Sequence, residues 1–89
     1  MSGAQTILVV EDEAKIARWV RTYFEQAGFR VLLAEDGELG LALAESEVPD
    51  LLILDLNLPK LDGVELCRRI RQSSRPAVAA LPVIMLTAR

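Results

Sequence analysis

The sequence predicts an α/β domain built on a doubly wound parallel sheet. Short apolar segments alternate along the chain with longer segments in which apolar residues recur at helical spacing. The short segments lack the polar alternation of a half-exposed strand, which indicates strands buried on both faces. Strands that alternate with helices usually pair in parallel and are covered by helices on both faces, so we expect one domain over residues 1–89.

The predicted elements follow from the apolar pattern and from the residues that interrupt it. Gly28 and Pro49 stand where the first two helices should end. Trp19, Tyr23 and Phe24 are predicted to be core residues of the first helix. We expect strands at Thr6–Val10, Phe29–Ala34, Leu51–Leu54 and Leu81–Leu86, helices at Ala14–Ala27, 39–47 and Gly63–Arg71, and an exposed loop over 72–81.

Composition restricts the possible functions. The formal net charge is −3 and there is no long basic run, which argues against nucleic-acid binding by this segment. Histidine is absent, which excludes histidine-based catalysis and the commonest transition-metal ligand. Cys67 is the one cysteine and cannot form an internal disulfide, which fits a reducing compartment. No apolar run approaches the roughly 18 residues of a membrane span. We therefore expect a cytoplasmic location and no membrane contact.

Acidic residues follow two of the predicted strands. Glu11 and Asp12 follow the first strand, and Asp55 follows the third. In a flavodoxin-like sheet of order 2-1-3-4 these strands are neighbours at the point where strand order reverses, which is where such sheets bind ligands. Converging carboxylates repel one another, and Mg²⁺, which prefers oxygen ligands, relieves that repulsion. The backbone carbonyl of Asn57 could supply another oxygen, and Thr87 places a hydroxyl after the fourth strand.

This set of groups suits phosphoryl transfer onto Asp55. Aspartate can act as a phosphate-accepting nucleophile, and catalysis then consists mainly of positioning and charge neutralisation. Each of these residues could also have a purely structural role. Glu11 and Asp12 also suit the start of a helix, Thr87 suits a strand, and the residues after Asp55 suit a turn.

Three motifs carry a resemblance to a known family. The stretches "ILVVEDE", "LLILDLNLPKLDG" and "VIMLTAR" resemble the receiver domain of two-component response regulators, from about Thr6 to Arg89. "DLNLPKLDG" and "LTAR" are most similar to the winged-helix transcription-factor class of these regulators. In that family Pro59, Asp62 and Gly63 would form the turn into the third helix.

The resemblance implies a role for each candidate site residue. Asp55 would accept a phosphoryl group from the phosphohistidine of a sensor histidine kinase. Asp12 and Asp55 would ligate Mg²⁺, with Glu11 acting through water and Asn57 through its carbonyl. Thr87 would hydrogen-bond the phosphoryl group and act as the switch. The domain would be a signalling module rather than an enzyme, and its output would be transcription regulation by a DNA-binding domain absent from this sequence.

One departure from the family concerns the end of the chain. The family continues with a further helix-strand-helix portion that carries a lysine and an aromatic switch residue. We therefore expect an incomplete receiver domain over 1–89. Its fourth strand would be an unpaired apolar edge, and such edges recruit other chains. A homodimer or a domain-swapped oligomer is the expected result.

Two other functions compete with this interpretation. A haloacid dehalogenase-type phosphohydrolase also places an aspartate nucleophile after an apolar strand. In those enzymes an aspartate usually stands two residues further on as acid and base, whereas this sequence has Asn57. The second alternative is a receiver-like interaction module that never carries phosphate. Lys60 is interpreted as a simple loop charge, and Arg68, Arg69 and Arg71 as a solvated helix face.

Overall fold

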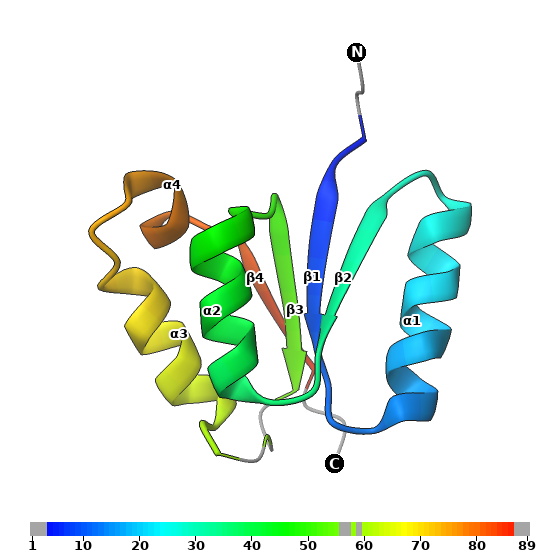
Figure 1. The fold of residues 1–89 in the computed structure, drawn as a ribbon, viewed down its shortest axis with the longest axis horizontal. Helices are drawn as coiled ribbons and strands as arrows, with labels where there is room; N and C mark the ends of the chain where they lie inside the picture. Colours follow the sequence, from blue (N-terminus) through cyan, green and yellow to red (C-terminus); the bar gives the residue numbers. More distant parts are fainter. Residues whose placement is uncertain (1–3, 56–57, 59, 87–89) are drawn as a thin grey trace.

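Four parallel strands form the centre of the molecule, with helices on both faces (Figure 1). The computed structural model describes residues 4–55, 58 and 60–86. The strands pair in the order β2-β1-β3-β4, which confirms the predicted flavodoxin-like fold. The elements are β1 (Thr6–Val10), α1 (Ala14–Gln26), β2 (Arg30–Ala34), α2 (Gly37–Glu47), β3 (Leu51–Asp55), α3 (Gly63–Arg71), α4 (Pro76–Ala79) and β4 (Val83–Leu86).

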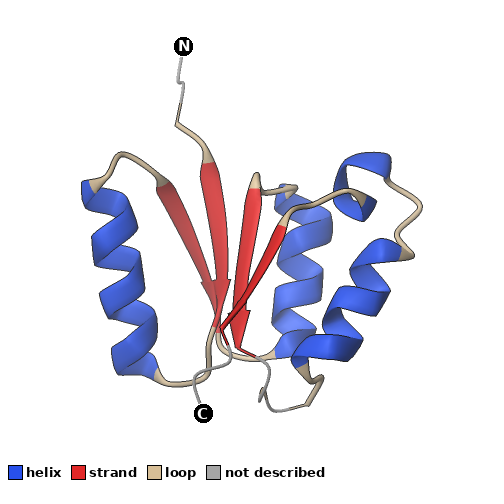
Figure 2. Cartoon of the chain, turned by 180° about the vertical axis from the view of Figure 1, so that it is seen from behind, coloured by secondary structure: helices blue, strands red, loops and turns tan. Residues whose placement is uncertain are grey.

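The two faces of the sheet form separate core layers. Leu8 and Val10 of β1 face α2 and α3, whereas Ile7 and Val9 face α1. The same alternation runs through β3, so the central strands are buried on both sides (Figure 2). This explains why their sequences are continuous apolar runs. Because all three strand pairs are parallel, the carboxyl ends of the four strands lie at one edge of the sheet.

The prediction that the aromatic residues of α1 all lie in the core is wrong for two of them. Trp19 is 78% exposed and Tyr23 is 68% exposed. Ala17, Val20 and Phe24 form the face that packs on the sheet, and Phe24 makes an edge contact with Phe29. Trp19 and Tyr23 each lie one residue before a core position, and one residue rotates a side chain by about 100° around a helix. The apolar arc of α1 is therefore wider than the face that the sheet covers.

The segment before β4 also differs from the prediction of a plain exposed loop. It contains α4, which begins at Pro76, a residue favoured at the first helical position. Val78 and Leu81 are buried in the α3 side of the core. Arg71 donates hydrogen bonds from Nη1 to the carbonyl oxygens of Ala79 (3.0 Å) and Leu81 (2.7 Å). Two buried apolar side chains and the hydrogen bonds of Arg71 thus help to fix the segment.

The outer strand β4 exposes apolar side chains. Ile84, Met85 and Leu86 are 49%, 42% and 38% exposed. Among the strands in the described part of the chain, β4 pairs with β3 alone. Neither the sheet nor a helix covers this edge within those residues.

Candidate metal centre

Three acidic side chains meet where β1 and β3 end. The two strands are parallel neighbours, with Val10 paired in register with Leu54. Glu11 and Asp12 follow β1 directly, and Asp55 is the last residue of β3. Each of the three offers a carboxylate oxygen, and these oxygens all lie within 4.8 Å of one another. The structure thus brings together three of the five residues predicted for the site.

The cluster combines two buried acids with one exposed acid. Glu11 is 6% exposed and Asp55 is 4% exposed, whereas Asp12 is open to solvent. Burial raises the pKa of the Glu11 carboxyl, and the neighbouring Asp55 and Asp12 raise it further. A hydrogen bond from the Glu13 amide to Glu11 Oε2 (3.1 Å) partly opposes this rise in pKa. Ionised Glu11 is therefore poorly stabilised by the protein alone.

The arrangement fits a hard divalent cation. Mg²⁺ takes oxygen ligands at about 2.0–2.1 Å, so two ligands on one ion lie about 3–4 Å apart. The observed separations require only small side-chain movements to reach that range. A cation would also offset the mutual repulsion that raises the pKa of Glu11. Glu11, Asp12 and Asp55 are the residues that would hold it.

The other residues that were predicted for the site or its turn fall into two groups. Asn57 and Thr87 lie outside the described residues, as does Pro59 of the predicted turn. Asp62 directly precedes α3, and its Oδ1 accepts a hydrogen bond from the Glu65 amide (2.9 Å). Asp62 is thus a helix cap, a common role for aspartate at this position.

The chain matches a protein-family model described as the response regulator receiver domain, over residues 7–89. It belongs to that family. Across the described residues of this receiver domain, no helix is long and apolar enough to cross a membrane.

Relatives of the receiver domain include named transcriptional regulators. It is 46% identical over 83 residues to the alkaline phosphatase synthesis transcriptional regulatory protein PhoP of Bacillus subtilis, covering 93% of this chain and 33% of PhoP. It is 49% identical over 83 residues to the KDP operon transcriptional regulatory protein KdpE of Escherichia coli, covering 93% of this chain and 35% of KdpE. The receiver domain therefore spans about a third of the length of these relatives.

Solved structures agree with this fold. The chemotaxis response regulator CheY4 of Vibrio cholerae aligns with a TM-score of 0.90 at 31% identity, covering 97% of this chain and 70% of CheY4. The receiver domain of sensor histidine kinase PA1611 from Pseudomonas aeruginosa aligns with a TM-score of 0.89 at 34% identity, covering 97% of this chain and 69% of that one. The PA1611 structure has a magnesium ion coordinated in its active site cleft.

Sequence reasoning missed one buried acid near the cluster of this receiver domain. Asp36 is 8% exposed and directly precedes α2, and its Oδ1 accepts a hydrogen bond from the Leu39 amide (2.8 Å). Its Oδ2 lies 3.6 Å from Lys60 Nζ, so Lys60 is paired rather than a simple loop charge. An aspartate before an apolar helical segment is a readable capping signal. The pairing with Lys60 joins distant segments and has no local signal.

Proposed function

We propose that this receiver domain accepts a phosphoryl group on Asp55 from the phosphohistidine of a sensor histidine kinase, in a step that depends on Mg²⁺. The observation that carries the proposal is the cluster of Glu11, Asp12 and Asp55 at the ends of β1 and β3. Membership of the receiver family supports the same assignment.

In the proposed reaction an oxygen of the Asp55 carboxylate attacks phosphorus. The new bond forms between that oxygen and phosphorus as the bond from phosphorus to the histidine nitrogen breaks, and the imidazole leaves with the bonding electrons. Asp55 is the last residue of β3, so its backbone is fixed by pairing with β4 through the register of Asp55 with Leu86. A rigid strand end holds the nucleophile in one orientation.

Mg²⁺, when bound, would neutralise negative charge on the phosphoryl group and on the acids. Asp12 and Asp55 would hold the ion directly and Glu11 through water, with the Asn57 carbonyl as a further ligand. Asp12 is the exposed member of the cluster and gives the site its access to solvent. Glu11 is held in place by its amide, which donates a hydrogen bond to the Ala34 carbonyl (3.0 Å).

We assign the switch to Thr87. Leu86 pairs in register with Asp55, and Thr87 is the next residue in the sequence. A hydroxyl at this position would donate a hydrogen bond to the phosphoryl group. The output would be transcription regulation, as the names of PhoP and KdpE indicate for those proteins. A DNA-binding domain would supply that output, and the receiver segment itself would make no contact with nucleic acid.

A specific observation favours self-association of this chain as a second property. The exposed edge of β4 carries Ile84 and Leu86, both partly open to solvent. Ile84 is in register with Ile53, which belongs to the core layer under α1, so it extends that apolar face to the edge. A second copy that places its own β4 alongside would hydrogen-bond the backbone groups of this edge and bury these side chains.

A titration with beryllofluoride and Mg²⁺ tests the phosphoacceptor proposal. Beryllofluoride mimics a phosphoryl group on a carboxylate, so amide resonances around Asp55 should shift in the wild type and stay unchanged in Asp55→Asn. If the wild-type spectrum does not respond, the chain behaves as an interaction module. Continuous release of inorganic phosphate from small phosphate esters would instead indicate a phosphohydrolase.

A further inference from the structure

The loop between β3 and α3 is attached to the first turn of α2 by an ion pair. Lys60 Nζ lies 3.6 Å from Asp36 Oδ2. The Asp36 side chain is 11% exposed, and its other oxygen already caps α2 through the Leu39 amide. That amide, followed by the Lys60 charge, lowers the pKa of Asp36, so the carboxylate is ionised near neutral pH. The loop cation therefore meets a fixed anion.

A close backbone contact reinforces the ion pair. A Cβ atom on Gly37 would lie 2.0 Å from the carbonyl oxygen of Leu61 and 2.7 Å from its Cβ. Leu61 and Leu58 are both buried in the core layer beneath α2 and α3. The loop thus packs against α2 at a distance that only glycine permits.

The backbone of Lys60 adopts an uncommon conformation. Its φ is 65°, in the left-handed region that residues other than glycine, asparagine and aspartate rarely adopt. A lysine does not favour this conformation by itself, so surrounding contacts must hold it. Two interactions hold the backbone of Lys60 in this conformation. One is the ion pair of its side chain with Asp36, and the other is the burial of the next residue, Leu61.

The end of β2, which leads into the turn that contains Asp36, contacts the backbone of the acidic cluster. Ala34, two residues before Asp36, accepts a hydrogen bond from the Glu11 amide (3.0 Å). The segment from Ala34 to Asp36 therefore touches the end of β1 on one side and the loop that follows Asp55 on the other. It links the two chain segments that carry the carboxylates.

We propose that Asp36 and Lys60 are positioning residues that strengthen Mg²⁺ binding at Glu11, Asp12 and Asp55. The inference rests on the proposed function for the identity of the ion. The ion pair fixes Lys60 on the first turn of α2, in the loop between β3 and α3, and this prepares the site for the cation. We call the Asp36–Lys60 pair and the Gly37–Leu61 contact the loop latch.

A simple charge effect and the loop latch predict opposite changes in Mg²⁺ affinity for Lys60→Met. Lys60 is a cation in the loop that follows β3, so removing its charge should tighten Mg²⁺ binding if Coulomb repulsion of the ion is its main influence. The latch predicts that the same removal weakens binding. Lys60→Met therefore separates the two explanations by the direction of the change.

The experiment is a double-mutant cycle with Mg²⁺ affinity as the readout. Lys60→Met and Asp36→Asn should each weaken binding by about two- to fivefold, the range of a partly exposed ion pair. Asparagine caps helices as well as aspartate does, so Asp36→Asn leaves α2 capped. The double variant should be no weaker than either single variant, and Lys60→Arg should restore most of the affinity.

A matched control comes from the ion pair between Arg30 and Glu47. Its N···O distance is also 3.6 Å, and Arg30 is the first residue of β2, at the opposite end from the cluster. Arg30→Gln and Glu47→Gln should leave Mg²⁺ affinity unchanged. Tighter or unchanged binding in Lys60→Met, or additive losses in the double variant, would overturn the latch.

A second readout keeps the latch separate from the metal proposal. If the wild type binds no Mg²⁺, the proposed function fails, and backbone order parameters of the metal-free protein then decide the latch. The Lys60 and Leu61 amides should become more mobile in Lys60→Met and Asp36→Asn and stay rigid in Lys60→Arg. Equal order parameters in all of these variants would show that the ion pair does not hold the loop.

Discussion

Glu11 and Asp55 place carboxylate oxygens within 4.8 Å of each other although both residues are more than nine-tenths buried. The closeness follows from parallel pairing, because β1 and β3 end side by side. Two acids in such surroundings are costly unless a cation or a proton is present, and the raised pKa of Glu11 reflects that cost. The fold thus maintains an arrangement that a divalent cation would stabilise.

Removing the carboxylates should remove Mg²⁺ binding. We expect Asp12→Asn and Asp55→Asn each to weaken Mg²⁺ binding by at least about tenfold, since even outer-shell partners of metal ligands matter to that extent. The double variant should show no binding by calorimetry. Asp62→Asn is the matched control, because it removes one carboxylate outside the cluster and keeps the cap of α3. Equal affinities in the double variant and the control would place the ion elsewhere.

Gly37 and Gly28 should respond differently to the same substitution. Gly37→Ala puts a methyl group against the Leu61 carbonyl and should cost about 1–3 kcal/mol in the free energy of unfolding. It should also weaken Mg²⁺ binding by disturbing the loop latch. Gly28 has φ +97° and open space around it, so Gly28→Ala should cost about 1–2 kcal/mol from backbone conformation alone.

Urea unfolding and Mg²⁺ titration together distinguish the two glycines. Mg²⁺ affinity should change in Gly37→Ala and stay constant in Gly28→Ala. A stable Gly37→Ala variant with unaltered Mg²⁺ affinity would mean that the Gly37–Leu61 contact does not position the loop.

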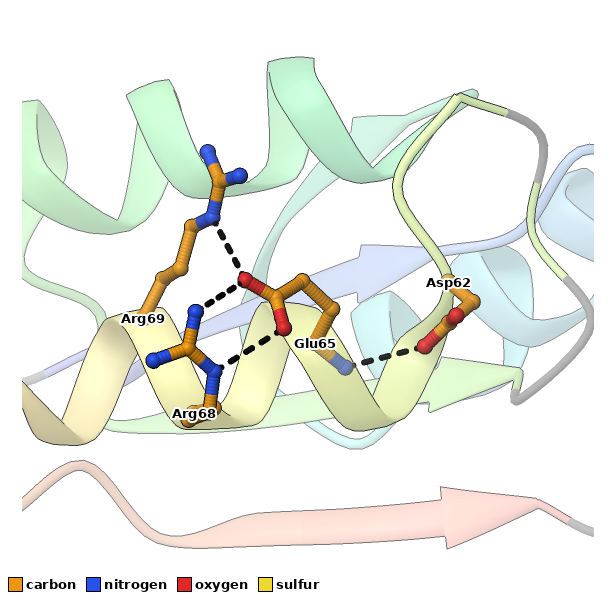
Figure 3. A network of polar contacts seen from close by, with 4 residues as sticks. All are labelled: Asp62, Glu65, Arg68 and Arg69. Carbon is orange, nitrogen blue, oxygen red and sulfur yellow. Dashed lines mark hydrogen bonds and ion pairs between the residues drawn. The ribbon is translucent and has the colours of Figure 1, made fainter.

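Glu65 should make stability depend on pH in the acid range. Its carboxylate accepts hydrogen bonds from Arg68 Nε (2.9 Å) and Arg69 Nε (2.9 Å), as Figure 3 shows. Hydrogen bonds from Arg68 and then Arg69 lower its pKa from 4.5 to about 2. A lowered pKa in the folded state gives stability that is complete above pH 4.5 and is lost as the pH falls towards 2.

Glu65→Gln should therefore lower stability near neutral pH and flatten the pH dependence of unfolding between about pH 4.5 and pH 2 by the same amount, and both effects should be small because both arginine partners are exposed. Denaturant midpoints measured at several pH values check this. An identical acid slope in the variant would assign that slope to other carboxyl groups.

Much of the fold and the position of the acidic cluster could be predicted from the local sequence pattern. The apolar runs of β1 and β3 are readable because both faces of these strands are buried, and parallel pairing then places Asp55 beside Glu11. The exposure of Trp19 could not be predicted, since it depends on which neighbours cover the flank of α1. The pairing of Lys60 with Asp36 joins residues in two different loops, and periodicity carries no information about such contacts.

The exposed edge of β4 should cause this 89-residue chain to self-associate at micromolar concentration. Ile84→Lys places a charge on that edge, which is how natural edge strands avoid pairing, and should shift the chain towards monomer. Val64→Lys is the control, because Val64 is 64% exposed on α3 and is not part of β4. Size-exclusion chromatography with light scattering gives the mass. A monomeric wild type, or equal association of the two variants, would exclude pairing through β4.

The most direct test of the central claim is the site of phosphorylation. The chain is incubated with acetyl phosphate and Mg²⁺, and its intact mass is measured before and after treatment with hydroxylamine, which cleaves acyl phosphates. We predict the addition of one phosphoryl group that requires Mg²⁺, is removed by hydroxylamine and is absent in Asp55→Asn. Phosphate that survives hydroxylamine, or that still adds to Asp55→Asn at another residue such as Thr87 or Asp62, would contradict the assignment of Asp55 as the phosphoacceptor.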